Sequence, residues 1–103
     1  MVLFRVVIEP SAAQEIRSIF NNSAEQGRWS FSETVEYVSS LEQRIYSLAQ
    51  HPQRFSYDEF TTKRQYRSFG HGSHKVFYAV DENRMIVHVA AILRSRSNYG
   101  KTL

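Results

Sequence analysis

Two amphipathic segments joined by a very short link constrain the fold of this chain more than any other feature. In the second segment, apolar residues recur at steps of three and four, which is typical of a helix with one buried face. Ser30 and Glu33 form a capping box at its start, and Pro52 ends it near Gln50. The apolar positions are Phe31, Val35, Val38, Leu41, Ile45 and Leu48.

The first segment runs from Ser11 to about Gly27 and begins with a similar capping box, formed by Ser11 and Gln14. Its apolar positions include Ile16, Ile19 and Phe20. Because only residues 27 to 29 separate the two segments, we expect an antiparallel helical hairpin. Trp29 is expected to pack at the bend.

Four runs of β-branched and aromatic residues predict strands at residues 2–8, about 65–69, 74–81 and 84–94. The sequences GHGS and DENR supply turns between the last three strands. The order is therefore β-α-α-β-β-β, an α+β domain spanning residues 1–103. The N-terminal strand joins a three-stranded antiparallel meander packed against the helical hairpin. Phe55, Tyr57 and Phe60 are expected to hold the connection at residues 51–64 in place.

A trial register that pairs Phe69 with His74, and Asp81 with Arg84, sorts the strand residues onto two faces. The face expected under the helices holds Arg67, Phe69, His74, Val76, Tyr78, Val87, Val89, Ala91 and Leu93. The other face holds Tyr66, Ser68, Lys75, Phe77, Ala79, Ile86, His88, Ala90, Ile92 and Arg94. A slip of one residue would exchange the two sets.

Composition excludes several classes of protein. The chain has no cysteine, which rules out disulfides, thiolate zinc sites and a cysteine nucleophile. No apolar run reaches the ~18 residues of a membrane span. We therefore expect a soluble, cytoplasmic protein that makes no membrane contact. The net charge of +3, with basic residues crowded into the second half, favours an acidic partner, either nucleic acid or an acidic protein segment. The alternative is that these charges only solubilise the surface.

Three histidines could be proposed as metal ligands, namely His71, His74 and His88. The trial register places His74 and His88 on opposite faces, and no cysteine or suitably placed carboxylate completes a ligand set. The sequence therefore predicts no metal site and no cofactor. His88 is interpreted as a hydrogen-bonded histidine of the sheet.

The segment YRSFGHGSHKVFYAVDENRMIVHVAAILRSRSN resembles the C-terminal half of toxins of the RelE/ParE superfamily of bacterial type II toxin-antitoxin systems. The matching pieces are Arg67, the turn at 70–73, HKVFYAV at 74–80, DEN at 81–83 and AILRSRSN at 91–98. PSAAQEI at 10–16 and LAQHPQRF at 48–55 also match. The resemblance implies a growth-inhibiting toxin of a plasmid-stabilisation type of system, neutralised by a cognate antitoxin encoded by a neighbouring gene.

The superfamily divides by target. Its ribosome-dependent nucleases cut messenger RNA with basic residues on the first hairpin and with an arginine and a tyrosine after the last strand. Here the corresponding places hold Tyr66, Ser68, Lys75 and Ser95, with Tyr99 in place of the tyrosine. ParE-like members poison DNA gyrase, have a longer helical hairpin, and end the last strand with a leucine-histidine-x-arginine segment. LRSR at 93–96 matches this segment except at Arg94, so the resemblance favours the ParE-like branch.

Three functions follow from the resemblance: a gyrase poison without a catalytic site, a ribosome-dependent endoribonuclease, or a non-toxic module that binds antitoxin or nucleic acid. The expected contact residues for target or antitoxin are Arg67, Lys75, Arg94 and Arg96. In a ribonuclease these would bind phosphate, and Tyr99 or a histidine would transfer the proton. An alternative interpretation of Arg67 is structural: it would pair with a carboxylate or carbonyl near the helix ends. A homodimer and a heterotetramer with the antitoxin both remain open.

Overall fold

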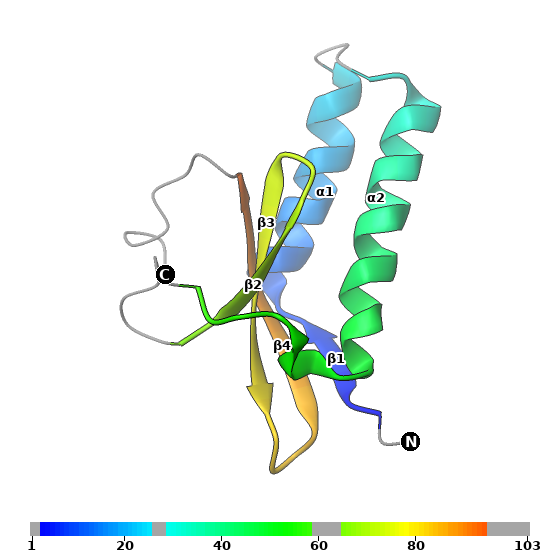
Figure 1. Cartoon of the computed structure of the whole chain (residues 1–103). Helices are drawn as coiled ribbons and strands as arrows, with labels where there is room; N and C mark the ends of the chain where they lie inside the picture. The colour runs from blue at the N-terminus through cyan, green and yellow to red at the C-terminus, as the bar shows by residue number, and fades with distance from the viewer. Residues whose placement is uncertain (1–2, 26–28, 59–64, 95–103) are drawn as a thin grey trace.

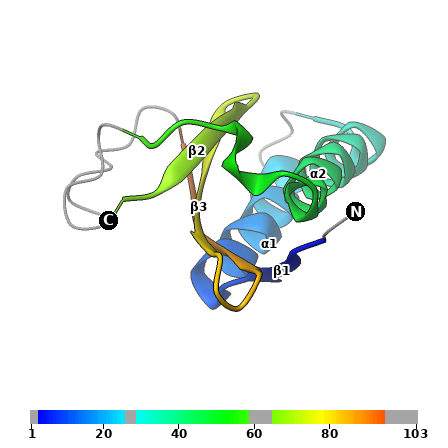
Figure 2. The ribbon, with the colours of Figure 1, turned by 60° about the horizontal axis from the view of Figure 1, so that its bottom comes forward.

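The computed structural model describes residues 3–25, 29–58 and 65–94. Two helices, α1 (Pro10–Glu25) and α2 (Phe31–Tyr46), lie antiparallel against one face of a four-stranded sheet (Figures 1 and 2). The strands are β1 (Arg5–Ile8), β2 (Arg67–His71), β3 (His74–Asp81) and β4 (Ile86–Arg94). The sheet order is β1-β4-β3-β2, with β1 parallel to β4 and the other pairs antiparallel. The predicted β-α-α-β-β-β order is confirmed.

Helix α1 begins earlier than the sequence suggested. Pro10 is its first residue, because the fixed φ and missing N–H of proline suit that position, and the amide of Ala13 donates to the carbonyl of Glu9 at 2.9 Å. The predicted capping box of Ser11 and Gln14 is therefore wrong. The Ser11 hydroxyl instead donates to the carbonyl of Ala90, 2.6 Å away on β4. Neither helix in the described part of the chain is long and apolar enough to cross a membrane.

Helix α2 begins with the predicted capping box. The Ser30 hydroxyl accepts from the amide of Glu33, and the Glu33 carboxylate accepts from the amide of Ser30, both at 3.2 Å. Val38, Leu41 and Ile45 are buried as predicted, followed by Leu48 in a 3₁₀ turn, η1 (Ser47–Ala49). The expectation that Phe31 lies on the buried face is wrong. In the first turn of α2 it is 67% exposed, and its ring makes an edge-on contact with Phe20 of α1.

The connection after α2 is held against β2. It contains a second 3₁₀ turn, η2 (Pro52–Arg54), and Phe55 stacks on Phe69 with ring centroids 5.0 Å apart. The amide of Asp58 donates to the carbonyl of Tyr66 at 2.7 Å. The aromatic anchoring is thus confirmed for Phe55, whereas Phe60 lies outside the described residues.

The strand pairs are offset from the trial register by two residues. Phe69 pairs with Val76 and Asp81 with Ile86, so every side chain up to Val89 keeps its predicted face. Beyond that point a bulge changes the pattern, because Tyr78 pairs with Val89 while Phe77 pairs with Ala91.

Ala90 is therefore the extra residue on β4, and the faces exchange beyond it. Ile92 lies under the helices, and Ala91 and Leu93 lie on the other face, opposite to the prediction. The start of α1 and the residue before it stabilise this bulge. The Ser11 hydroxyl donates to the carbonyl of Ala90, and the amide of Glu9 donates to the carbonyl of Val89.

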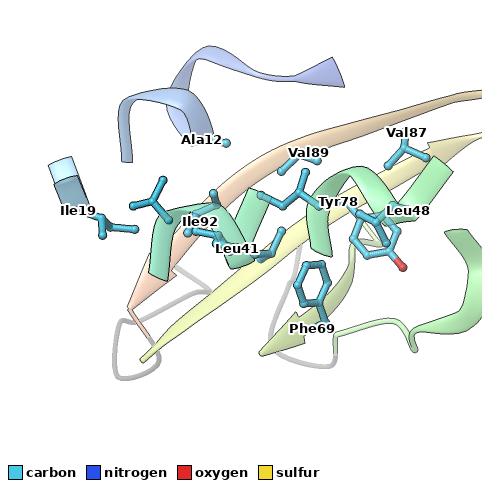
Figure 3. Close-up of a cluster of buried hydrophobic side chains, with 12 residues drawn as sticks. Ala12, Ile19, Leu41, Leu48, Phe69, Tyr78, Val87, Val89 and Ile92 are labelled. Carbon is cyan, nitrogen blue, oxygen red and sulfur yellow. The ribbon is translucent and has the colours of Figure 1, made fainter. Parts of the chain in front are cut away.

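The main core fills the space between the helices and the sheet (Figure 3). Tyr78 is a fully buried member of this core, and its hydroxyl donates to the carbonyl of Pro52 at 2.6 Å. Burial raises the pKa of this phenol to about 12, so it stays protonated. A smaller cluster of Tyr66, Phe77 and Ala91 occupies the face of the sheet that carries no helix. The helices therefore cover one face of the sheet and leave the face with Tyr66, Phe77 and Ala91 without a helix.

Candidate target-binding surface

Arg67 is held by the protein's own carbonyl groups. Its Nη1 donates to the carbonyls of Gln53 at 3.1 Å and Phe55 at 2.7 Å, and its guanidinium lies 4.2 Å from the centre of the Tyr57 ring. It thereby fastens the η2 connection to β2. This agrees with the structural role predicted for Arg67, in which it pairs with a carbonyl near the helix ends. The side chain also lines an open cavity of about 550 Å³ with Asp81 and Glu82.

Lys75 is paired with an acidic residue that sequence proximity did not reveal. Its Nζ lies 2.5 Å from Oδ2 of Asp58, which also accepts from the Ser68 hydroxyl at 2.8 Å. Asp58 is only 8% exposed, so this carboxylate depends on these partners. The pair ties the connection to β3, and the lysine charge is largely neutralised where it stands. The one sequence signal near Asp58 was the group of aromatic residues around it, which predicted an ordered connection but not this ion pair.

Arg94 lies apart from Lys75. The sequence placed both on one face, but the Ala90 bulge pairs Arg94 with His74 and Lys75 with Leu93, so the two cations face opposite sides of the sheet. The prediction that Lys75 and Arg94 share one face of the sheet is therefore wrong. Arg94 is exposed at the end of β4. Arg96 and Tyr99 lie outside the described residues.

A polar cluster joins α2 to the β2–β3 turn; we call Tyr37, Ser40, Arg44, His71 and His74 the hairpin cluster. The Tyr37 hydroxyl donates to the carbonyl of His71 at 2.8 Å and lies 2.7 Å from Nδ1 of His74. Arg44 donates to the carbonyl of Gly70 at 2.6 Å and lies 3.3 Å from Nδ1 of His71. Ser40 lies 3.1 Å from Nε2 of the same imidazole. Five side chains thus fix the hairpin to the helix.

Burial and neighbouring charges lower the pKa of both histidines of this cluster. Burial, followed by the charge of Arg44, lowers the pKa of His71. Burial, followed by the charges of Arg94 and His71, lowers the pKa of His74. Burial also raises the pKa of Tyr37, so its hydroxyl keeps its proton. Sequence reasoning assigned these histidines to the turn and its flank and missed Tyr37, which lies more than 30 residues earlier.

His88 lies on the helix-free face and is hydrogen-bonded, as the sequence suggested. Its Nδ1 is 2.8 Å from Oε1 of Glu9, the residue that precedes α1. The pair borders a hollow of about 490 Å³ with Tyr66, and the small side chains of Ala79 and Ala90 also line it. An imidazole oriented by a carboxylate is an arrangement that can transfer a proton.

The three candidate metal ligands do not converge. His71 and His74 pair with each other across the β2–β3 turn, on the face of the sheet that the helices cover. His88 lies on β4 between Val7 and Ala79, and its side chain is on the opposite face. No group of three histidine, aspartate or glutamate side chains within the described ranges could hold a metal ion.

Comparison with known proteins now bears on this arrangement. The solved chromosomal ParDE toxin-antitoxin system of P. aeruginosa matches with a TM-score of 0.72 at 10% identity, covering 91% of this chain and 98% of that one. The toxin-antitoxin complex RelBE2 of Mycobacterium tuberculosis matches with a TM-score of 0.61 at 12% identity, covering 90% and 99%. A mutant of the E. coli toxin RelE in the free state matches with a TM-score of 0.54 at 9% identity, covering 91% and 85%.

At such low identities these likenesses establish the fold alone. No curated protein matches the sequence. The family described as the ParE toxin of the type II toxin-antitoxin system parDE matches residues 6–99, which is nearly the whole chain. The chain therefore belongs to the ParE toxin family of type II toxin-antitoxin systems.

Proposed function

We propose that this toxin stops bacterial growth by poisoning DNA gyrase and that a cognate antitoxin from a neighbouring gene neutralises it. The family match over residues 6–99 supports the toxin role and the partnership. The choice of gyrase rests on one structural observation, which concerns the cations expected to bind RNA phosphate. Arg67 is bound to backbone carbonyls and Lys75 to Asp58, so both already serve the fold.

A nuclease site needs cations aimed at one point, because the transferred phosphate gains charge in the transition state. In the described part of the chain, the side chains of Lys75 and Arg94 project from opposite faces of the sheet, so they cannot bind the same phosphate. A protein-binding toxin has no such requirement. Its contacts can be spread over a surface, with Arg94 as an exposed contact at the end of β4.

Controlled expression in bacteria tests this proposal. We expect growth to stop, with covalent gyrase-DNA breaks and with intact translated messages. Cleaved messages without DNA breaks would refute gyrase as the target, and unimpaired growth from folded protein would refute toxicity. Co-expression of the neighbouring antitoxin gene should restore growth.

Arg94→Ala tests the contact role with little risk to the fold, because the side chain is exposed. We expect it to weaken gyrase poisoning. Arg84→Ala is the matched control, since Arg84 is an exposed arginine whose side chain is 79% accessible, in the β3–β4 turn. Equal toxicity of the two variants would remove Arg94 from the contact surface.

A second candidate function, ribosome-dependent RNA cleavage, is favoured by the Glu9–His88 pair beside its hollow. Here His88 would accept the proton of a ribose 2′-hydroxyl, and Glu9 would orient the imidazole. His88→Gln should then abolish message cleavage on ribosomes while leaving the free energy of unfolding within about 0.5 kcal/mol of wild type. Unchanged growth arrest in this variant would leave gyrase poisoning as the explanation.

A further inference from the structure

A groove on the outer side of α2 has a chemical character that none of the functions above uses. It has a volume of about 470 Å³ and is lined by Trp29, Glu33, Glu36, Tyr37 and Ser40. Glu33, Glu36, Tyr37 and Ser40 recur at steps of three and four along one side of α2, and Trp29 precedes the first residue of that helix. The described lining thus combines two aromatic rings with two carboxylates and contains no lysine or arginine.

The aromatic wall of the groove is held in position. Trp29 packs on Tyr37 with ring centroids 4.7 Å apart and the planes inclined by 45°. Tyr37 is in turn anchored by its hydroxyl to His71 and by close approach to the backbone of Gly72. Because these two side chains are already held in place, they lose little conformational entropy when a ligand binds to them.

The carboxylates lie on the same surface. Glu33 uses Oε1 to accept the amide of Ser30, and Glu36 is exposed, with no hydrogen bond or ion pair among the described residues. The whole chain carries a net charge of +3, so this groove is a local negative site on a basic protein. Electrostatic complementarity therefore favours a cation.

We propose that the groove binds an arginine side chain of a protein partner. A guanidinium group stacks flat on an aromatic ring and at the same time donates a fork of hydrogen bonds to carboxylates. The groove offers both elements, the indole of Trp29 and the carboxylates of Glu33 and Glu36. The site goes beyond the proposed function, because it lies on α2 and does not require gyrase to be the target.

Trp29 is the only tryptophan of the chain, so its fluorescence reports directly on the groove. The full-length protein is titrated with the blocked tripeptide acetyl-Gly-Arg-Gly-amide. We expect a saturable change in emission, which free N-acetyltryptophanamide does not show. The same peptide with neutral citrulline should bind about two- to fivefold more weakly, which is the size of a cation–aromatic contact at an accessible site.

Glu36→Gln should weaken binding of the arginine peptide by a similar factor and leave the circular dichroism spectrum unchanged. Glu42→Gln is the matched control, a carboxylate of α2 that does not line the groove. It should bind like the wild type. Equal binding of the citrulline peptide, or equal loss in the two variants, would overturn the proposal. Tighter binding of the corresponding lysine peptide would overturn the choice of arginine.

Discussion

Tyr37→Phe should lower the free energy of unfolding by an amount that follows from the contacts of the hairpin cluster. The substitution removes one hydroxyl and keeps the ring, so the packing on Trp29 and Gly72 is preserved. What is lost is a hydrogen bond of 2.8 Å to the carbonyl of His71 and one of 2.7 Å to the imidazole of His74. Leaving buried polar groups without a partner costs about 1–3 kcal/mol. His74 is 5% exposed, so water cannot easily replace the hydroxyl.

Urea unfolding followed by circular dichroism measures this loss. With an m-value of about 1–3 kcal/mol/M for a small protein, the midpoint should fall by about 1 M at an unchanged m-value. Tyr46→Phe provides the control, since Tyr46 lies on the same helix and is 53% exposed. It should change the free energy of unfolding by less than about 0.5 kcal/mol. If both variants lose the same small amount, the hydroxyl of Tyr37 does not hold the hairpin.

Three further predictions concern the histidines of the hairpin cluster, the glycines beside them, and Arg67. Because both hairpin histidines have lowered pKa values when folded, stability should be full above the ordinary histidine pKa of about 6.5 and fall below it. The limiting slope is about 1.4 kcal/mol per pH unit for each proton, and replacing both histidines by glutamine should flatten the urea-midpoint profile. Gly72→Ala should cost more than about 1–2 kcal/mol in the same assay, since φ is +56° and the new Cβ would lie 2.6 Å from the Tyr37 ring. Gly70→Ala, whose Cβ would meet nothing within 4 Å, should cost clearly less. Arg67→Lys should lower the melting temperature by several degrees, because a lysine cannot both bind two carbonyls and stack on the Tyr57 ring; an unchanged melting temperature would contradict that bracing role.

The sequence by itself determined the elements and their order, because these depend on local patterns. Steps of three and four placed Val38, Leu41 and Ile45 in the core, and the capping box at Ser30 set the start of α2. Alternation assigned the strand faces correctly up to Val89, even though the pairing was offset by two residues. A two-residue error preserves faces, since side chains alternate with a period of two.

Some residues of the candidate site could also be identified from the sequence, but the groups that they contact could not. Arg67 was identified with two roles, and the structure supplies the carbonyl partners of the structural one. Lys75 was identified as a contact for target or antitoxin, and the structure pairs it with Asp58, which lies in the connection after α2. Residue type and spacing could not predict these partners, because the contacts form only when separate segments pack together.

Tertiary structure alone decided where the faces of β4 exchange. The bulge at Ala90 is stabilised by the hydroxyl of Ser11, a residue of α1 that lies 79 residues earlier in the chain. No local pattern in β4 marks that extra residue, because the bonds that accommodate it come from α1. As a result Arg94 lies on the same face as His74, and the two cations that alternation placed on one face, Lys75 and Arg94, lie on opposite faces.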